Sequence, residues 1–258
     1  MDLTLAQDAA GLLAGGLVGF SLALTGGGGS ILAVPLLVYL VGVADPHTAI
    51  GTSAVAVAGN AAVNLVTHAR AGNVKWRCAS VFTAAGVAGA LLGSTIGKAI
   101  DGERLLALFA ILMVVVAGLM LWRKEGVPRL NVRLDRDNFP WLVTLGIAAG
   151  TLSGFFGIGG GFLVVPALML ATGMPVLNAI GSSLVAVTAF GLTTAANYAT
   201  SGLVDWVLAA VFVAGGIVGG IGGALLARRL AARRGLLRRL FAVLILAVAV
   251  YMFVASLG

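Results

Sequence analysis

Apolar residues along the chain fall into long runs that are separated by short polar or glycine-containing breaks. In the first half these runs cover residues 9–24, 30–43, 48–67, 78–97 and 105–122. In the second half they cover residues 141–156, 161–173, 177–199, 204–227 and 240–257. A helix needs about 20 apolar residues to cross the hydrocarbon core of a bilayer, and most runs approach that length. Because the runs do not alternate between apolar and polar positions, the pattern predicts an all-α polytopic membrane protein rather than a barrel.

The first two runs of each half are shorter than the others. With about 16 and 14 residues they extend only about 21–24 Å as helices, whereas the hydrocarbon core is about 30 Å thick. A glycine-rich stretch separates the two runs, "TGGGGS" from Thr25 in the first half and "GIGGGF" from Gly157 in the second. Each pair of runs forms either two short spans or a re-entrant hairpin. We favour the hairpin, because irregular backbone near mid-membrane is tolerated when it is buried or lines a cavity.

The two halves of the chain are copies of one unit. "GFSLALTGGGGSILAVPLL" from Gly19 aligns with "GTLSGFFGIGGGFLVVPAL" from Gly150, and "AIGTSAVAV" from Ala49 aligns with "AIGSSLVAV" from Ala179. The spacing between matched residues is nearly constant, and internal repeats are common in transporters. The sequence therefore predicts a first repeat at residues 1–122, a cytoplasmic linker at 123–139 and a second repeat at 140–258.

Composition agrees with a membrane protein. Hydrophobic residues make up 60% of the chain and charged residues 10%, whereas soluble domains have about 25% charged residues. The net charge is +7, but the basic residues cluster between apolar runs, where they act as topology signals. We therefore expect a lipid bilayer as partner and no nucleic acid.

The distribution of charge predicts that the two repeats are inverted. The loop after the third run holds Arg70, Lys75 and Arg77 in the first repeat but only Asp205 in the second. The loop before the last run reverses this, with six arginines between residues 228 and 239 and a balanced set at 98–104. By the positive-inside rule, equivalent loops face opposite sides of the membrane. This places a multi-pass protein in the plasma (inner) membrane with both termini outside, provided that each short pair crosses an even number of times.

The glycine runs are the first candidate site. A helix start presents unpaired N–H groups and the positive end of the helix dipole, and glycine lets an anion approach closely. Two inverted copies bring two such starts together near mid-membrane, without a buried cation. The predicted substrate-binding residues here are Gly26, Gly27, Gly28, Gly29, Ser30, Gly157, Gly159, Gly160 and Gly161. Spaced glycines have a different expected role, the close packing of helices; these are Gly11, Gly15, Gly19, Gly89, Gly93, Gly219 and Gly223.

Uncharged polar residues in the third run of each repeat are the second candidate. Several of them share one helix face and would complete the shell around an oxyanion. The predicted residues are Thr52, Ser53, Asn60, Asn64, Ser182, Ser183, Thr194 and Asn197. Hydrogen bonding between helices, or from a hydroxyl to its own backbone, is the alternative role for any one of them.

Other chemistry is not indicated. All nine acidic residues lie at the chain ends or in loops, which argues against an intramembrane carboxylate relay. We expect no catalytic residues, no metal site and no cofactor. An intramembrane serine hydrolase that uses Ser53 with His68 is a remote alternative, since these residues lie about 22 Å apart along one helix.

At the paired "GGGGSILAVPLL" and "IGGGFLVVPAL" motifs, each followed by "AIGTS" or "AIGSS", the sequence resembles the TauE/SafE (sulfite exporter) family. The resemblance covers nearly the whole chain. It implies a membrane transporter, in particular an exporter, of a small sulfur-containing oxyanion or organosulfonate, such as sulfite, sulfoacetate or thiosulfate. A passive small-anion channel is the alternative. The substrate, direction, coupling ion and oligomeric state stay open, with a homodimer as one option.

Overall fold

The computed structural model describes residues 5–25, 28–122, 132, 134–229, 246 and 248–251. Every regular element within these residues is helical. The longer helices are α1 (Leu5–Thr25), α3 (Pro46–Arg70), α4 (Trp76–Ala99), α5 (Gly102–Trp122), α6 (Phe139–Phe156), α7 (Gly161–Thr172), α8 (Val176–Ala199) and α9 (Trp206–Arg229). Between α1 and α3 the chain forms a 3-10 helix, η1 (Gly28–Leu32), one turn of α-helix, α2 (Ala33–Pro35), and a π-helix, η2 (Leu36–Leu40).

The expected all-α membrane fold class is confirmed. Five of the described helices, α3, α4, α6, α8 and the Trp206–Gly223 part of α9, are long and apolar enough to cross a membrane. Two shorter apolar helical stretches, Gly29–Leu40 and Gly161–Thr172, follow the glycine runs. The molecule therefore combines spanning helices with half-length ones.

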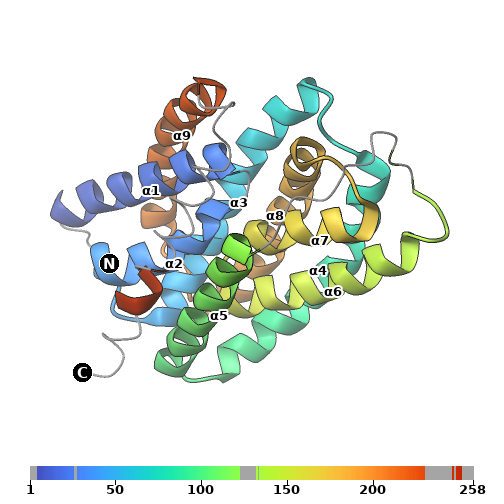
Figure 1. Ribbon diagram of the computed structural model, residues 1–258. Helices are drawn as coiled ribbons and strands as arrows, with labels where there is room; N and C mark the ends of the chain where they lie inside the picture. The colour runs from blue at the N-terminus through green and yellow to red at the C-terminus, as the bar shows by residue number, and fades with distance from the viewer. Residues whose placement is uncertain are drawn as a thin grey trace.

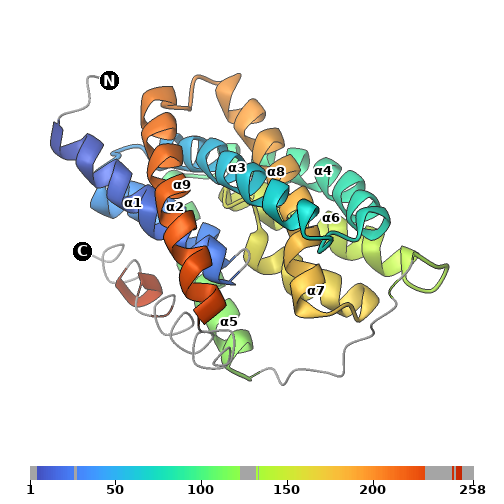
Figure 2. The same cartoon turned by 90° about the horizontal axis from the view of Figure 1, so that it is seen from above.

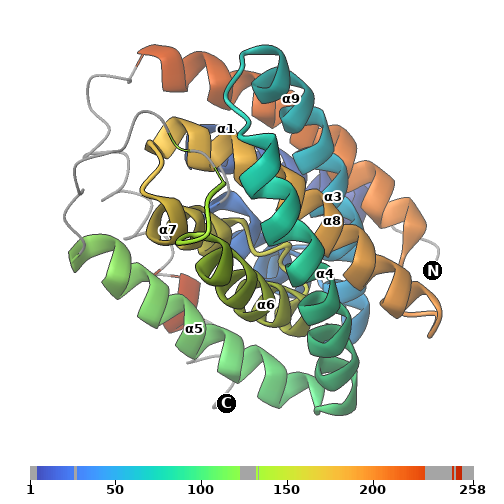
Figure 3. The same cartoon turned by 90° about the vertical axis from the view of Figure 1, so that its right-hand side faces the viewer.

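Each pair of packed helices contains one helix from each half of the chain. Helix α1 packs along α9 on one side of the molecule, α4 packs along α6 on the other, and α3 and α8 lie together between these pairs (Figures 1 and 2). Helix α5 lies along an edge of the molecule (Figure 3), where Phe109 packs on Phe156 with ring centroids 5.3 Å apart. Each half thus supplies one helix to each outer pair and one to the centre.

Glycines let the outer pairs approach closely. A Cβ added to Gly19 would overlap the carbonyl group of Gly216, and one added to the equivalent Gly150 would overlap that of Gly86. Gly15, Gly89, Gly93, Gly219 and Gly223 meet the backbone of a neighbouring helix in the same way, and Gly11 meets the side chains of Leu208 and Val211 on α9. The packing role predicted for Gly11, Gly15, Gly19, Gly89, Gly93, Gly219 and Gly223 is confirmed.

The contacts also fix the directions of the helices. The order of the glycine contacts shows that α1 runs parallel to α9, and α4 parallel to α6. The Asp205 N–H donates to the Thr52 hydroxyl at 2.9 Å, which joins the starts of α9 and α3. The Lys75 N–H donates to the Ser182 hydroxyl at 2.9 Å, which joins the loop before α4 to the start of α8. Because the start of α3 packs on the end of α8, the set α1, α3 and α9 runs opposite to the set α4, α6 and α8.

The helix before each glycine run is longer than expected. Helix α1 has 21 residues and α6 has 18, so the prediction of about 16 residues is wrong, and at 1.5 Å per residue the two helices measure about 31 and 27 Å. The helices begin earlier than the apolar runs because polar and interfacial residues, Gln7 and Asp8 in α1 and Phe139 in α6, form their first turns. The short stretch after each glycine run is confirmed in length, although in the first half it is a 3-10, α and π succession rather than one α-helix.

Some expectations lie outside the described residues. Of the last predicted run, residues 240–257, the structure describes 246 and 248–251, which are helical. The linker is described only at 132 and 134–139. The boundaries of the two repeats stay a prediction.

Candidate substrate site

The second glycine turn joins α6 to α7 through left-handed backbone. The φ angles of Gly157, Gly159 and Gly160 are +66°, +62° and +68°, a region that residues with a Cβ rarely adopt. At the start of α7 the N–H groups of Leu163 and Val164 donate to the Gly160 carbonyl at 2.8 and 2.9 Å. Within the described residues, the N–H groups of Gly159 and Gly160 donate no backbone hydrogen bond. The turn therefore presents donors at the positive end of a helix.

This turn lies at the junction of the two halves. A Cβ added to Gly159 would lie 2.6 Å from Val57 of α3 and 3.1 Å from Val187 of α8, and these two valines are equivalent positions of the repeat. The buried Ser53 hydroxyl donates to the carbonyl of Gly157 at 3.0 Å and to that of Ile50 at 2.8 Å. The structure thus places Ser53 against the glycine turn.

The short helical stretch after the first glycine run, η1, packs against α7. Gly26 and Gly27 fall outside the described residues, and Gly28 begins η1. Gly29 packs on the backbone of α1, and Ser30 is fully buried. The short helices that follow the two glycine runs therefore lie next to each other in the structure.

Several predicted ligands hold helices together. The hydroxyls of Thr52 and Ser182 accept the backbone N–H groups described above, whereas Ser183 donates within α8, to the Ile180 carbonyl at 2.8 Å. The Asn197 carboxamide donates to Ser94 at 2.7 Å. These residues have structural partners, and a role for them in binding substrate stays a prediction.

Asn60 and Asn64 line a cavity of about 220 Å³ between α1, α3, α8 and α9, whose outer lining includes the exposed apolar residues Val63, Ile217 and Ile221. The inner residues Leu22 and Leu184 are buried, and Asn60 is only 1% exposed. From there the lining follows α3 through half-buried Asn64 to exposed Thr67. We name this space the Asn60 cavity. It leads from the interior of the molecule toward the end of α3.

Three buried polar side chains near this site lack hydrogen bonds within the described part of the chain. They are the Asn60 carboxamide, through both Nδ2 and Oδ1, and the hydroxyls of Thr194 and Ser153. Ser153 was not predicted as a site residue, yet a Cβ on Gly160 would lie 3.0 Å from its hydroxyl oxygen. Its position in α6, four residues before the glycine turn, is the signal that sequence analysis missed. Such unpartnered groups are few in folded proteins and call for an explanation.

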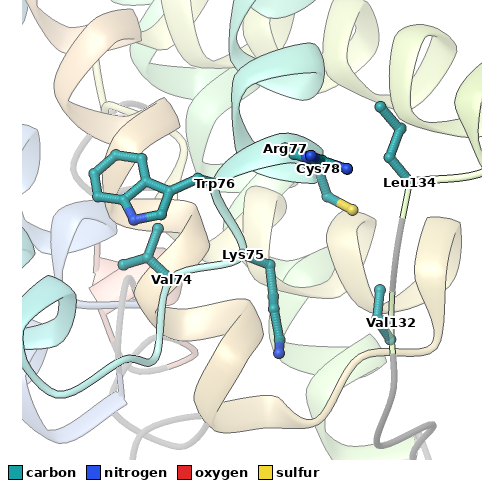
Figure 4. Close-up of a pocket in the computed structure, with 7 residues that line it drawn as sticks. All are labelled: Val74, Lys75, Trp76, Arg77, Cys78, Val132 and Leu134. Carbon is teal, nitrogen blue, oxygen red and sulfur yellow. The ribbon is translucent and has the colours of Figure 1, made fainter.

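A second cavity, of about 340 Å³, lies at the start of α4 (Figure 4). Lys75, Arg77 and Cys78 line it together with Val132 and Leu134. Figure 4 shows the Cys78 sulfur on the side of Val132 and Leu134. Because this loop follows α3 directly, two cations gather at the same end of the molecule to which the Asn60 cavity leads. Such a charge distribution raises the local concentration of anions.

Long apolar helices, half-length helices that follow glycine runs, and a cavity that holds the buried Asn60 carboxamide together define a polytopic helical membrane transporter. The chain matches the family described as Sulfite exporter TauE/SafE over residues 11–252, and it belongs to that family.

The relatives carry matching names. A "Probable membrane transporter protein" of Xylella fastidiosa strain Temecula1 is 54% identical over 242 residues, which cover 92% of this chain and 91% of the relative. A protein of the same name from strain 9a5c is 55% identical, with the same coverage. The "Probable membrane transporter protein YunE" of Bacillus subtilis strain 168 is 27% identical over 74% of this chain and 78% of its own length. No solved structure matches the chain.

Proposed function

We propose that this membrane transporter exports a small sulfur-containing oxyanion or organosulfonate of the sulfite, sulfoacetate or thiosulfate type. The description of the family as sulfite exporters supports the sulfur chemistry and the direction. The names of the family and of its relatives indicate a transporter rather than an enzyme. The buried Ser53 hydroxyl donates to two backbone carbonyls, which also disfavours a nucleophilic role in the serine hydrolase alternative.

The contact between the short helices that follow the two glycine runs carries this proposal. Helix η1 contacts α7, and Gly159 lies between the equivalent residues Val57 and Val187. The anion binds to backbone N–H groups at these helix starts, where the dipoles favour negative charge. The hydroxyl of Ser153 adds a donor beside Gly160, and Ser53 holds the turn in place. No buried cation is needed for this kind of site.

The transport cycle exposes this site alternately to the two sides of the membrane. The opposed directions of α1, α3 and α9 against α4, α6 and α8 support repeats that are inverted in the membrane. In transporters of this kind, one repeat moves against the other around a central site. Counting the basic loops with the positive-inside rule puts Arg70, Lys75, Arg77 and the linker in the cytoplasm and both termini outside.

Anion binding to the purified protein tests the proposed substrate class. Thermal unfolding is measured with sulfite, sulfate, thiosulfate, sulfoacetate and acetate, because a ligand that binds the native state raises the unfolding temperature. We expect a rise with one or more sulfur oxyanions and none with acetate. Equal curves with every anion contradict the proposed substrate class. Counterflow in proteoliposomes separates a carrier from the passive channel, since only a carrier exchanges labelled for unlabelled solute against a gradient.

A matched pair of glycine variants tests the glycine turn. Gly159→Ala adds a Cβ beside Val57 and Val187, at a φ of +62°. Gly202→Ala adds one at a φ of +70° with no atom within 4 Å, so it imposes backbone strain without a clash. We expect Gly159→Ala to abolish the anion-dependent shift and Gly202→Ala to preserve it. An intact shift in a folded Gly159→Ala variant removes this turn from the site. Ser53→Ala, which removes the hydroxyl that bonds to the Gly157 and Ile50 carbonyls and adds no atom to the turn, is the second variant if Gly159→Ala does not fold.

A further inference from the structure

Asn60 of α3 and Phe190 of α8 occupy equivalent positions of the two repeats. Each faces a glycine of a neighbouring helix, and those glycines are equivalent too. A Cβ added to Gly216 would overlap the Asn60 carboxamide, and one added to Gly86 would overlap the Phe190 ring. Phe190 is fully buried and stacks on Phe82, with centroids 6.3 Å apart and planes at 29°. The fold therefore accepts an apolar side chain at this position, and packing does not require a carboxamide.

The carboxamide of Asn60 is energetically unfavourable where it lies. Both of its polar atoms are buried without a hydrogen bond in the described part of the chain, and a buried unpaired group costs about 1–3 kcal/mol. An uncharged polar side chain inside a membrane-spanning region usually hydrogen-bonds across to another helix, and Asn60 makes no such bond within the described residues. Asn60 lies at the buried end of a cavity of about 220 Å³, several times the share of about 30 Å³ that a water molecule occupies in the liquid.

We propose that the Asn60 cavity is a second binding site for the transported oxyanion, between the glycine turns and the membrane surface where α3 ends. The Asn60 Nδ2 group donates to an oxygen of the solute, and Oδ1 accepts from water or from a protonated oxygen of the solute. Asn64 and Thr67 continue the polar lining toward Lys75 and Arg77. The identity of the solute rests on the proposed function, whereas the location of the path does not.

The equivalent path in the second repeat is closed. Phe190 fills the position of Asn60, and Thr194, which corresponds to half-buried Asn64, is only 1% exposed. Tyr198 corresponds to half-buried His68 and is fully buried. The structure therefore assigns access to one end of the molecule, the end at which α3 finishes.

Thiol accessibility tests the path without reference to any substrate. In a Cys78→Ala background, which removes the one native cysteine, cysteine replaces Asn64 in one variant and its equivalent Thr194 in another. A membrane-impermeant thiol reagent is applied to sealed vesicles of each orientation. Ala71→Cys, in the exposed loop after α3, marks the side on which that loop lies. We expect Asn64→Cys to react at least about tenfold faster than Thr194→Cys, a difference of about 1.4 kcal/mol, and from the same side as Ala71→Cys.

Replacing the carboxamide tests the binding role. Asn60→Leu removes the unpaired polar group, so we expect an unfolding temperature equal to or above that of the parent protein. Solute exchange is expected to fall at least about tenfold. The matched control is Phe190→Leu, an apolar change at the equivalent position. A lower unfolding temperature in Asn60→Leu with normal exchange would make Asn60 a structural residue and overturn the proposal.

These outcomes are separable from those of the proposed function. If no sulfur oxyanion shifts the unfolding temperature but Asn64→Cys remains the reactive variant, the substrate class is wrong and the path stands. If oxyanions do bind and the two cysteines react equally, the path is wrong and the substrate class stands. Equal reaction of the two cysteines overturns the further inference in either case.

Discussion

The polar face of α3 and its counterpart on α8 have nearly the same backbone setting and opposite surroundings. Each helix packs between an outer helix pair and its twin, and each faces a glycine of the neighbouring α9 or α4. On α3, Asn60 and Asn64 border a cavity, whereas on α8 the equivalent Phe190 and Thr194 are packed. The difference shows that a few side chains, rather than the arrangement of helices, decide which of the two equivalent helix faces borders a cavity.

On the closed side, a lysine of α4 is bonded to the end of α8. The Lys98 ammonium group donates to the Asn197 carbonyl at 2.8 Å, to its side-chain Oδ1 at 2.9 Å and to the Ser201 hydroxyl at 2.9 Å. It also lies 5.8 Å from the centre of the Tyr198 ring. A cation at this point complements the negative end of the α8 dipole. Lys98 therefore ties the end of α4 to the end of α8, across the mouth of the path that Phe190 blocks.

Exchanging the two side chains should reverse the comparison, and this is the largest effect that we expect. In the double variant Asn60→Phe, Phe190→Asn, the new phenyl ring at position 60 lies opposite Gly216, just as the Phe190 ring of the parent protein lies opposite Gly86. We expect Thr194→Cys to become reactive and Asn64→Cys to become protected, each by at least about tenfold. Labelling in sealed vesicles in the Cys78→Ala background measures both changes.

The single variant Asn60→Phe is the control for this exchange. It fills the open path while the other stays closed, so solute exchange should fall to the background of empty proteoliposomes while elution in size-exclusion chromatography stays normal. Unchanged exchange in this variant would show that solute does not pass Asn60, and the comparison between the two helices would then have no functional meaning.

Phe190→Asn alone should mainly affect stability. It removes a buried ring that stacks on Phe82 and leaves a carboxamide in an apolar site, so we expect a loss of about 3 kcal/mol. Thermal unfolding in detergent measures the loss as a lower midpoint. Phe190→Leu, which keeps an apolar side chain, should be milder by at least about 1 kcal/mol. If both variants unfold at the same temperature, the polarity of the site does not matter and only ring packing does.

Lys98→Met should weaken the closed side by a smaller amount. The change removes three hydrogen bonds from a half-buried position, and bonds that involve a charged group contribute about 1.5–3 kcal/mol each at most. We expect the labelling rate of Thr194→Cys to rise about threefold to tenfold. Lys98→Arg keeps the charge and is the conservative control. A rate that is the same in Lys98→Met and in the parent would mean that Phe190 closes the path by itself.

The sequence allowed the membrane class, the helices and the importance of the glycine runs to be predicted, because apolar run length and unusual glycine clusters are local signals. The lengths of α1 and α6 were underestimated, since polar residues such as Gln7 and Asp8 can form a first helical turn in the interfacial region. The asymmetry between Asn60 and Phe190 is visible in the aligned repeats. The cavity at Asn60 could not be predicted from that alignment, because it depends on which side chains of α1 and α9 lie beside α3.

Ser53 and Ser153 show the same limit at the glycine turn. Ser53 was predicted from its place in a repeated motif, but its partner, the Gly157 carbonyl, lies 104 positions away in the chain. Ser153 has no counterpart in the first repeat, where the equivalent residue is Leu22, so repetition gave no signal for it. Contacts between distant segments, rather than local patterns, determine which of the polar residues reach the site.

The smallest expected effect concerns the first turns of the two central helices. Asp45 caps α3 by accepting the N–H groups of His47 at 3.2 Å and Thr48 at 2.9 Å, whereas the equivalent Pro175 before α8 has no capping side chain. Burial raises the pKa of the Asp45 carboxyl, but the hydrogen bonds from Thr48 and His47 and the nearby His47 ring lower it by more, so the net pKa lies below the ordinary 3.8. The ionised carboxylate thus stabilises the folded state at pH values above about 4, and this stabilisation is lost as the pH falls through the lowered pKa.

Asp45→Ala should therefore cost about 1 kcal/mol at neutral pH, and the difference from the parent protein should shrink as the solution is acidified below the ordinary pKa of the carboxyl. Thermal unfolding in detergent at a series of pH values measures this dependence. Pro175→Ala, at the uncapped start of α8, is the matched control, and its difference from the parent should not change with pH because no titrating group is removed. An Asp45→Ala difference that is equally constant with pH would mean that the carboxylate charge does not stabilise α3, and that the two helix starts differ in sequence but not in electrostatics.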